Sequence, residues 1–239
     1  MVSSEEAAAI ALLKRAVELD TSNRYTEAVV CYKEGIQIFL TVVQGLQDKT
    51  KKARYREKAS EYLERCENLD AKIRKDKEAG KFHEHIKIQA GSAGHGYETL
   101  FGRFLDDDVT SIEVDDPYIR AHHQIVNFLR CCELFVKKCS KLKEIKLKTS
   151  YDENNKMDQE SKLAELRKSL EKRNTSLLVE YSSTLHDREI RLNTGWIIKI
   201  GRGLDIFRAP EGKIVLGYFD LDLRPCLETT VDIFYKTER

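Results

Sequence analysis

The stretch YREKASEYLERCENLDAKI, residues 55–73, decides how the first third of this 239-residue chain folds. Its apolar positions are separated alternately by four and by three residues: Tyr55, Ala59, Tyr62, Cys66, Leu69 and Ile73. This period places them on one face of an α-helix, and that face needs a partner to bury it. The stretch therefore predicts an amphipathic helix that packs against other helices.

Two further helices are predicted upstream, from about Ser4 to Leu19 and from about Tyr25 to Leu46, with apolar residues again three and four apart. The turn cluster Asp20-Thr21-Ser22-Asn23 separates them, and residues 1–79 contain no proline. Short connections between amphipathic helices favour antiparallel neighbours. Residues 1–79 are therefore predicted to form a three-helix bundle.

Residues 80–96 differ from the bundle in composition, because four glycines fall within seventeen residues. This composition predicts a flexible linker. His83 and His85 form an HxH pattern, but no further residues have the spacing of metal ligands, so no metal site and no cofactor are expected.

Residues 97–239 alternate between strand and helix patterns. Helices are expected near 97–105, 120–137 and 159–173, strands near 110–114, 145–149 and 177–181, and a hairpin over 188–200. Strands that alternate with helices of ten or more residues favour a parallel sheet with helical crossovers. The predicted fold class is thus an α-helical bundle followed by an α/β domain.

Composition excludes several classes of protein. The 41 basic and 40 acidic residues nearly cancel, so bulk charge identifies no partner. No apolar run approaches the 18 residues of a membrane span, and the first run follows acidic residues, unlike a secretory signal. The six cysteines lack CxxC spacing and are interpreted as reduced, mostly buried thiols. A soluble cytoplasmic protein is expected.

Leu63 lies one residue off the apolar face of the third helix, and Glu67 follows four residues later on the same side. An apolar residue beside a carboxylate can receive an amphipathic helix that carries leucine and a basic residue. The alternative interpretation, a slightly widened core stripe, stays open on spacing alone.

A resemblance strengthens the first interpretation. The segments LKRAVELD (13–20), RYTEA (24–28) with Tyr32, and EYLERCE (61–67) resemble the MIT (microtubule-interacting and trafficking) domain. That family binds C-terminal helices of ESCRT-III subunits, commonly between its second and third helices. The resemblance implies that Leu63 is the groove leucine and that Glu67 pairs with a ligand arginine. Cys66 replaces the usual alanine, which is a small change on the core side.

The segment HDREIRLN, residues 186–193, resembles the HxKxxxxD motif of the phospholipase D superfamily. In that motif the histidine is a nucleophile and the lysine binds phosphate, but here the lysine position holds Arg188 and the aspartate position holds Asn193. This chemistry normally needs two histidines, and the chain carries one copy of the motif. A dimeric phosphodiesterase using His186 is therefore the alternative function, and catalysis is not expected.

The second half as a whole resembles the phospholipase-D-like domain that follows an MIT domain in one small family. The segments that carry the resemblance are DDPYIR (115–120), HDREIR (186–191), GWIIKIGRGLD (195–205), LRPC (223–226) and TTVDIF (229–234). The resemblance implies a homodimer that binds acidic phospholipids, without known catalysis. It also implies a role in abscission during cytokinesis, at the midbody and on late endosome membranes.

Basic residues in the hairpin agree with a lipid-binding role. His186, Arg188, Arg191, Lys199 and Arg202 are the candidate lipid-binding residues, with Arg188 in the phosphate pocket and Lys199 and Arg202 on the lipid surface. Nucleic acid would favour the same charges, but the stacking aromatics that it uses are missing among them, so it is not expected. His122 and His123, upstream of Cys131-Cys132, are interpreted as packing residues.

Overall fold

A computed structural model describes residues 4–236 of the chain. The chain divides into two compact units, residues 1–84 and residues 85–239.

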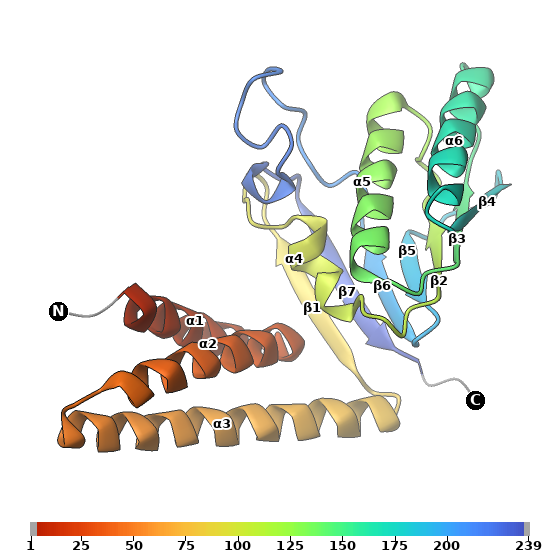
Figure 1. The fold of residues 1–239 in the computed structure, drawn as a ribbon. Helices are drawn as coiled ribbons and strands as arrows, with labels where there is room; N and C mark the ends of the chain where they lie inside the picture. The colour runs from red at the N-terminus through yellow and green to blue at the C-terminus, as the bar shows by residue number, and fades with distance from the viewer. Residues whose placement is uncertain (1–3, 237–239) are drawn as a thin grey trace. The chain divides into compact units, whose positions relative to one another are not determined.

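The N-terminal unit is a bundle of three helices: α1 (Ser4–Thr21), α2 (Tyr25–Gly45) and α3 (Lys49–Glu78) (Figure 1). Asn23 turns the chain between α1 and α2 with a positive φ of 60°. Asp48 caps α3, because its carboxylate accepts hydrogen bonds from the backbone amides of Thr50 and Lys51. The predicted three-helix bundle is confirmed.

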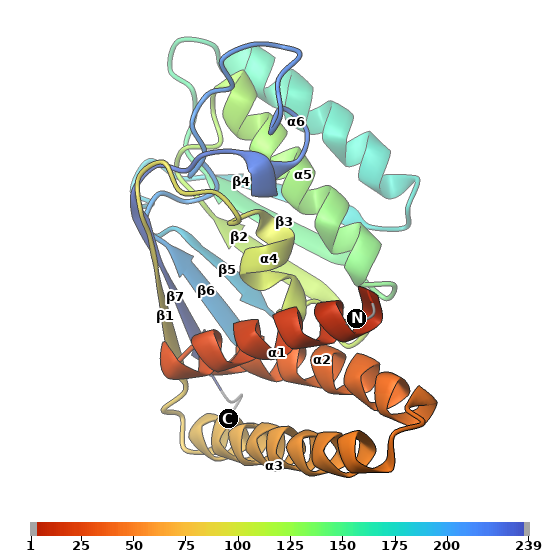
Figure 2. The same cartoon turned by 90° about the vertical axis from the view of Figure 1, so that its left-hand side faces the viewer.

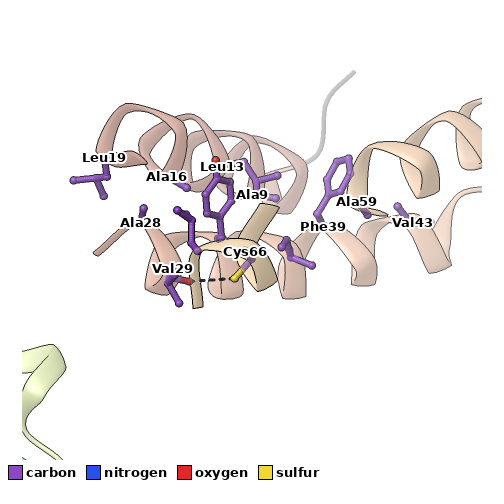
Figure 3. Close-up of a cluster of buried hydrophobic side chains, with 13 residues drawn as sticks. Ala9, Leu13, Ala16, Leu19, Ala28, Val29, Phe39, Val43, Ala59 and Cys66 are labelled. Atoms are coloured by element: carbon purple, nitrogen blue, oxygen red, sulfur yellow. Dashed lines mark hydrogen bonds between the residues drawn. The ribbon is translucent and has the colours of Figure 1, made fainter. Parts of the chain in front are cut away.

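The bundle core contains most of the apolar positions that the spacing selected on α2 and α3, whereas on α1 it confirms Leu13 but not Val17, which is 43% exposed. Each helix contributes buried side chains, shown together in Figure 3: Ala9, Leu13, Ala16, Leu19, Ala28, Val29, Tyr32, Ile36, Phe39, Val43, Ala59, Cys66 and Leu69. Burying one large side chain of this kind contributes roughly 1.5–3 kcal/mol. At the surface, Arg65 of α3 donates two hydrogen bonds, of 2.8 and 2.7 Å, to Asp20 of α1.

The C-terminal unit is built on a seven-stranded sheet of order β1-β7-β6-β5-β2-β3-β4. The strands are β1 (His83–Ile88), β2 (Ser111–Asp115), β3 (Glu144–Thr149), β4 (Ser176–Tyr181), β5 (Glu189–Leu192), β6 (Trp196–Ile200) and β7 (Thr229–Tyr235). Its helices are α4 (Tyr97–Phe101), α5 (His122–Lys138) and α6 (Lys156–Glu171), with short 3₁₀ turns at Gly102–Phe104 and Leu221–Leu223.

Pairing within the sheet is mixed. Strands β2, β3 and β4 are parallel and are joined by the crossover helices α5 and α6, whereas β5 and β6 continue the sheet as antiparallel strands. Figures 1 and 2 show α4, α5 and α6 on one face of the sheet. Apolar side chains such as Ile112, Val114 and Ile190 are buried, while the alternate positions carry charged residues.

One expectation needs correction. The region 80–96 contains strand β1, so the flexible-linker interpretation is wrong for residues 83–88, where histidines and glutamate obscure a strand of alternating burial. The predicted parallel strands and the predicted hairpin are confirmed, and the hairpin adds antiparallel strands beside β2. The predicted domain boundaries at 79 and 97 stay predictions.

The cysteines are free thiols, and all except Cys31 are buried, as predicted. Within the described part of the chain, no helix is both long enough and apolar enough to cross a bilayer.

Candidate functional site

A groove of about 660 Å³ lies between α2 and α3. Its floor and walls include Leu40, which is 42% exposed, and Leu63, which is 47% exposed. Single exposed leucines are common, but two that line the same groove form an apolar patch of the kind found at contact sites. The groove therefore offers an apolar surface for a partner.

The position of Leu63 follows from the helical period. Three residues further on, Cys66 points into the core and is only 3% exposed, and Leu69 is 1% exposed. Leu63 is rotated away from that buried stripe and lines the groove instead. The burial values favour the groove interpretation over the widened core stripe.

Acidic side chains border the same groove. Glu67 is exposed one turn after Leu63, and Asp70 pairs with Lys33 of α2 at 2.8 Å between Nζ and Oδ2. An apolar floor with a carboxylate at its edge suits an amphipathic helix that carries leucine and a basic residue. The structure thus brings Leu63 and Glu67 together on one surface.

Cys66 belongs to the core side of this groove. Its Sγ lies 4.0 Å from the carbonyl oxygen of Val29 (Figure 3). Burial raises the pKa of the Cys66 thiol, so the thiol stays neutral at physiological pH. Cys66 therefore packs α3 against α2.

A second hollow, of about 260 Å³, lies between α1 and α3. Its apolar lining includes Leu13 and Tyr62, and its charged residues are cations: Lys14, Arg54 and Lys58. The charge at the edge of this hollow is therefore opposite in sign to the acidic edge of the α2–α3 groove. A basic helix is therefore complementary to the α2–α3 groove, and an acidic segment to the α1–α3 hollow.

The C-terminal unit has its own hollow of about 260 Å³, near the start of α5 and the end of β6. Its lining is mostly polar and comprises Tyr118, Gln124, Arg188, Gly201, Arg202 and Asp205. Arg188 precedes β5, and Arg202 follows β6, so the hairpin brings both guanidinium groups to one place. We name these six residues the hairpin hollow.

Asp116 holds the floor of the hairpin hollow together. Its carboxylate accepts hydrogen bonds from the backbone amides of Leu204 (2.8 Å) and Tyr118 (3.0 Å). Burial raises the pKa of Asp116, while these hydrogen bonds and the charge of Arg188 act in the opposite direction. Gly203 has a φ of +66°, and a Cβ there would lie 2.1 Å from Asp116 Oδ2. Glycine is therefore required at position 203.

Arg188 lines the hairpin hollow. Its guanidinium donates to the carbonyl of Gly201 and lies 4.8 Å from the centre of the Tyr118 ring. Its Nε is buried and has no hydrogen-bond partner among residues 4–236. A buried donor without a partner costs about 1–3 kcal/mol, so this Nε is an unsatisfied group within a residue that lines the hollow.

Arg191 and Lys199 lie elsewhere, on the charged face of the sheet. Arg191 contacts Glu113 at 3.0 Å, Asp115 at 2.8 Å and also Glu189, while Lys199 contacts Glu189 at 3.2 Å. Burial of Arg191 lowers the pKa of its guanidinium, but the hydrogen bonds that Arg191 donates to these carboxylates raise that pKa more. Both cations are already compensated, so the geometry gives less support to a lipid role for them than for Arg188 and Arg202.

His186 is exposed and does not line the hairpin hollow. Asn193, at the position of the motif's aspartate, accepts hydrogen bonds from the amides of Thr110 and Ser111 and donates to the carbonyl of Asp108. Asn193 therefore fixes the hairpin turn to the start of β2.

The sequence interpretation missed Gln124 and Asp205 as site residues. Asp205 accepts hydrogen bonds from Gln124 (3.5 Å) and Asn127 (3.2 Å), and lies 3.3 Å from Nε2 of His123. His122 and His123 are exposed, so their interpretation as packing residues is wrong, although Cys131 and Cys132 are buried. For Gln124 the available signal was its place in the first turn of α5, and for Asp205 it was its place five residues after β6.

A grooved three-helix bundle followed by an α/β domain with a polar hollow defines an MIT-type protein with an additional C-terminal domain. Residues 6–71 match the MIT (microtubule interacting and transport) domain, and residues 94–235 match the phospholipase D-like domain at the C-terminus of MIT. The chain belongs to this family of two-domain proteins. It is 50% identical over 233 residues to MIT domain-containing protein 1 of Mus musculus, covering 97% of this chain and 94% of that relative.

Proposed function

We propose that this protein is a non-enzymatic adaptor that links ESCRT-III to membranes. Its bundle would bind C-terminal helices of ESCRT-III subunits in the α2–α3 groove. The observation that carries this proposal is the half-exposed Leu63 with Glu67 one turn away, in a groove with acidic residues at its edge. Membership of the MIT family supports the same class of partner.

The direct test is binding of fluorescent ESCRT-III tail peptides to the full chain, followed by anisotropy. Leucine- and arginine-patterned helical tails should bind, and the same peptides with their arginines replaced by glutamate should bind more weakly. If no tail of any ESCRT-III subunit binds, the adaptor proposal loses its main support.

We propose that the C-terminal domain binds acidic phospholipids as a homodimer. The hairpin hollow supports this, because two guanidinium groups meet there and Arg188 Nε is buried without a partner in residues 4–236. Basic residues near an anionic leaflet each contribute about 1 kcal/mol, and a dimer doubles the contacting surface. Such an adaptor would act at the midbody in cytokinetic abscission and on late endosome membranes.

The alternative function is a dimeric phosphodiesterase that uses His186, since a phosphate-binding hollow would serve either role. We expect no hydrolysis of a generic phosphodiester such as bis-p-nitrophenyl phosphate. His186 does not line the hollow, and Asn193 already holds the hairpin turn. Hydrolysis by the wild-type chain that is lost in His186→Ala would favour the enzyme instead.

A further inference from the structure

The longest irregular segment beside the hairpin hollow carries an unusual concentration of exposed apolar side chains. Residues 208–220, which we name the apolar loop, contain Ile214 at 96%, Leu216 at 88% and Phe219 at 82% exposure. Single exposed apolar residues are common. Three large apolar side chains that are almost fully exposed to solvent within six residues, in contrast, mark a contact site.

The ends and base of the apolar loop are fixed. Phe207 and Cys226 form an antiparallel bridge at its ends, and the Arg208 amide donates to the Pro225 carbonyl at 2.9 Å. At its base, the buried Arg224 donates from Nε to the Gly217 carbonyl at 2.6 Å, and also donates to Tyr218. A fixed base presents the tip without a large ordering cost on binding.

The glycine at the base allows this arrangement. Gly217 has a φ of +80°, and a Cβ there would lie 2.9 Å from the Leu223 carbonyl oxygen. The backbone therefore turns sharply at residue 217, which leaves Leu216 and Phe219 exposed on either side of a tight turn.

The apolar loop lies next to the hairpin hollow. On α5, Asn127 donates to Asp205 of the hollow at 3.2 Å, and Arg130 donates to the Tyr218 carbonyl of the loop at 3.0 Å. Residues three apart on a helix are neighbours on its surface, with about 5–6 Å between Cβ atoms. Figures 1 and 2 both show the loop at the end of the domain where α5 begins.

We propose that the apolar loop inserts Ile214, Leu216 and Phe219 into the lipid bilayer while the hairpin hollow holds an anionic headgroup. This inference rests on the proposed membrane binding and specifies its mode. The loop's own charges cancel, with Arg208 and Lys213 against Glu211 and Asp220, so its contribution is apolar and the hollow supplies the electrostatic attraction.

A bilayer fits this surface better than a protein groove does. The apolar side chains project from a loop tip instead of lining a hollow, and the adjoining surface contains Arg188 and Arg202. A protruding apolar tip beside cations matches the order of layers in an anionic leaflet, where charged headgroups overlie acyl chains.

Cosedimentation of the full chain with vesicles of phosphatidylcholine and phosphatidylserine tests the proposal. The triple variant Ile214→Ser, Leu216→Ser, Phe219→Ser should lose roughly tenfold or more in affinity. Its residual binding should fall further with salt, because the hollow is intact. Met157→Ser is the matched control, since Met157 is 84% exposed on α6, and it should bind like the wild type.

Penetration can be measured directly with brominated phosphatidylcholine in the same vesicles. Phe219→Trp should be quenched by lipids brominated along the acyl chain, and Met157→Trp should not; both retain the native Trp196 as a common background. Unquenched Phe219→Trp, or a triple variant that binds like the wild type, would overturn the insertion and leave the headgroup site standing.

Two other outcomes are distinguishable. If the triple variant loses affinity together with its dimer mass in light scattering, the loop contacts a second copy of the chain, and insertion is wrong. If the wild-type chain does not bind anionic vesicles at all, the proposed membrane binding itself is wrong, whatever the loop does.

Discussion

Leu63 and Cys66 lie three residues apart on α3, yet Leu63 is 47% exposed in the α2–α3 groove whereas Cys66 is 3% exposed in the core. Two residues one helical turn apart therefore differ in environment: Cys66 stabilises the bundle, and Leu63 is the residue that we propose contacts a ligand. This separation allows binding to be removed without unfolding the bundle.

Leu63→Asp should abolish binding of ESCRT-III tails, a loss of at least about tenfold, because a charge in an apolar contact is desolvated without a partner. The bundle should stay folded, with a stability change of about 1 kcal/mol or less, as is typical of surface positions. Tail anisotropy and circular dichroism measure the two effects. Val17→Asp, at 43% exposure on α1, is the control and should bind normally. If the Leu63→Asp variant is unfolded, Leu63 is a core residue and the groove interpretation is wrong.

Glu67→Lys should weaken the same tails several-fold, because it would repel the basic residue of the ligand, and the effect should shrink as salt screens the charges. Glu64→Lys is the control: it makes the same charge change three residues earlier on α3, outside the residues that line the groove. Equal affinities of the wild type and of Glu67→Lys would show that the tails bind elsewhere on the bundle, for which the α1–α3 hollow is the next candidate.

Gly203→Ala should destabilise the C-terminal domain by about 2–4 kcal/mol, since it combines a left-handed backbone with a Cβ that overlaps Asp116. Gly94→Ala is a matched control, because Gly94 has a φ of +82° but open space around its Cβ, and it should cost about 1 kcal/mol. Denaturant unfolding followed by the fluorescence of Trp196 reports on this domain. Equal losses of stability in Gly203→Ala and Gly94→Ala would show that the Asp116 side chain moves away from the added Cβ at little energetic cost.

The bundle was predictable from the sequence because its signal is local: core residues such as Ala59, Cys66 and Leu69 repeat at helical spacing, and the structure buries all three. Strand β1 was not predictable from the sequence, because His83, Glu84 and His85 are all polar. The alternating burial of its side chains arises only when the strand joins the sheet. The hairpin hollow was predictable in part. Arg188 and Arg202 flank one hairpin, but Asp205 meets Gln124 only through folding across 81 residues.

Arg191→Met should destabilise the C-terminal domain by about 1–3 kcal/mol at pH 7, allowing for partial exposure, because it leaves three carboxylates without their shared cation. Hydrogen bonds from Arg191 hold the pKa of Glu113 below its usual 4.5, against a smaller opposing effect of burial. The stability that this shift provides is present above about pH 4.5 and is lost as the pH falls through the lowered pKa.

The difference between wild type and Arg191→Met should therefore shrink below pH 4.5 in Trp196-monitored unfolding. Lys148→Met is the control, because Lys148 forms its ion pair with the exposed Glu180, and it should change stability little at any pH. A destabilisation by Arg191→Met that is independent of pH would assign its role to packing instead of to charge.

Arg202→Glu should reduce cosedimentation of the full chain with phosphatidylserine-containing vesicles more strongly than Lys199→Glu does, and the double variant should be released. The reason is charge compensation: Lys199 pairs with Glu189 at 3.2 Å on the charged face of the sheet, whereas Arg202 lines the hairpin hollow beside Arg188.

Wild-type binding should fall between ~0.05 and ~0.5 M salt, because the Debye length is about 10 Å at 0.1 M and shortens further with salt. Arg202→Glu should unfold like the wild type, since it changes an exposed side chain, whereas Lys199→Glu places a carboxylate opposite Glu189 and should be slightly less stable while staying folded. Binding to neutral vesicles that equals binding to anionic ones, or equal losses from Arg202→Glu and Lys199→Glu, would show that the hollow does not supply the attraction.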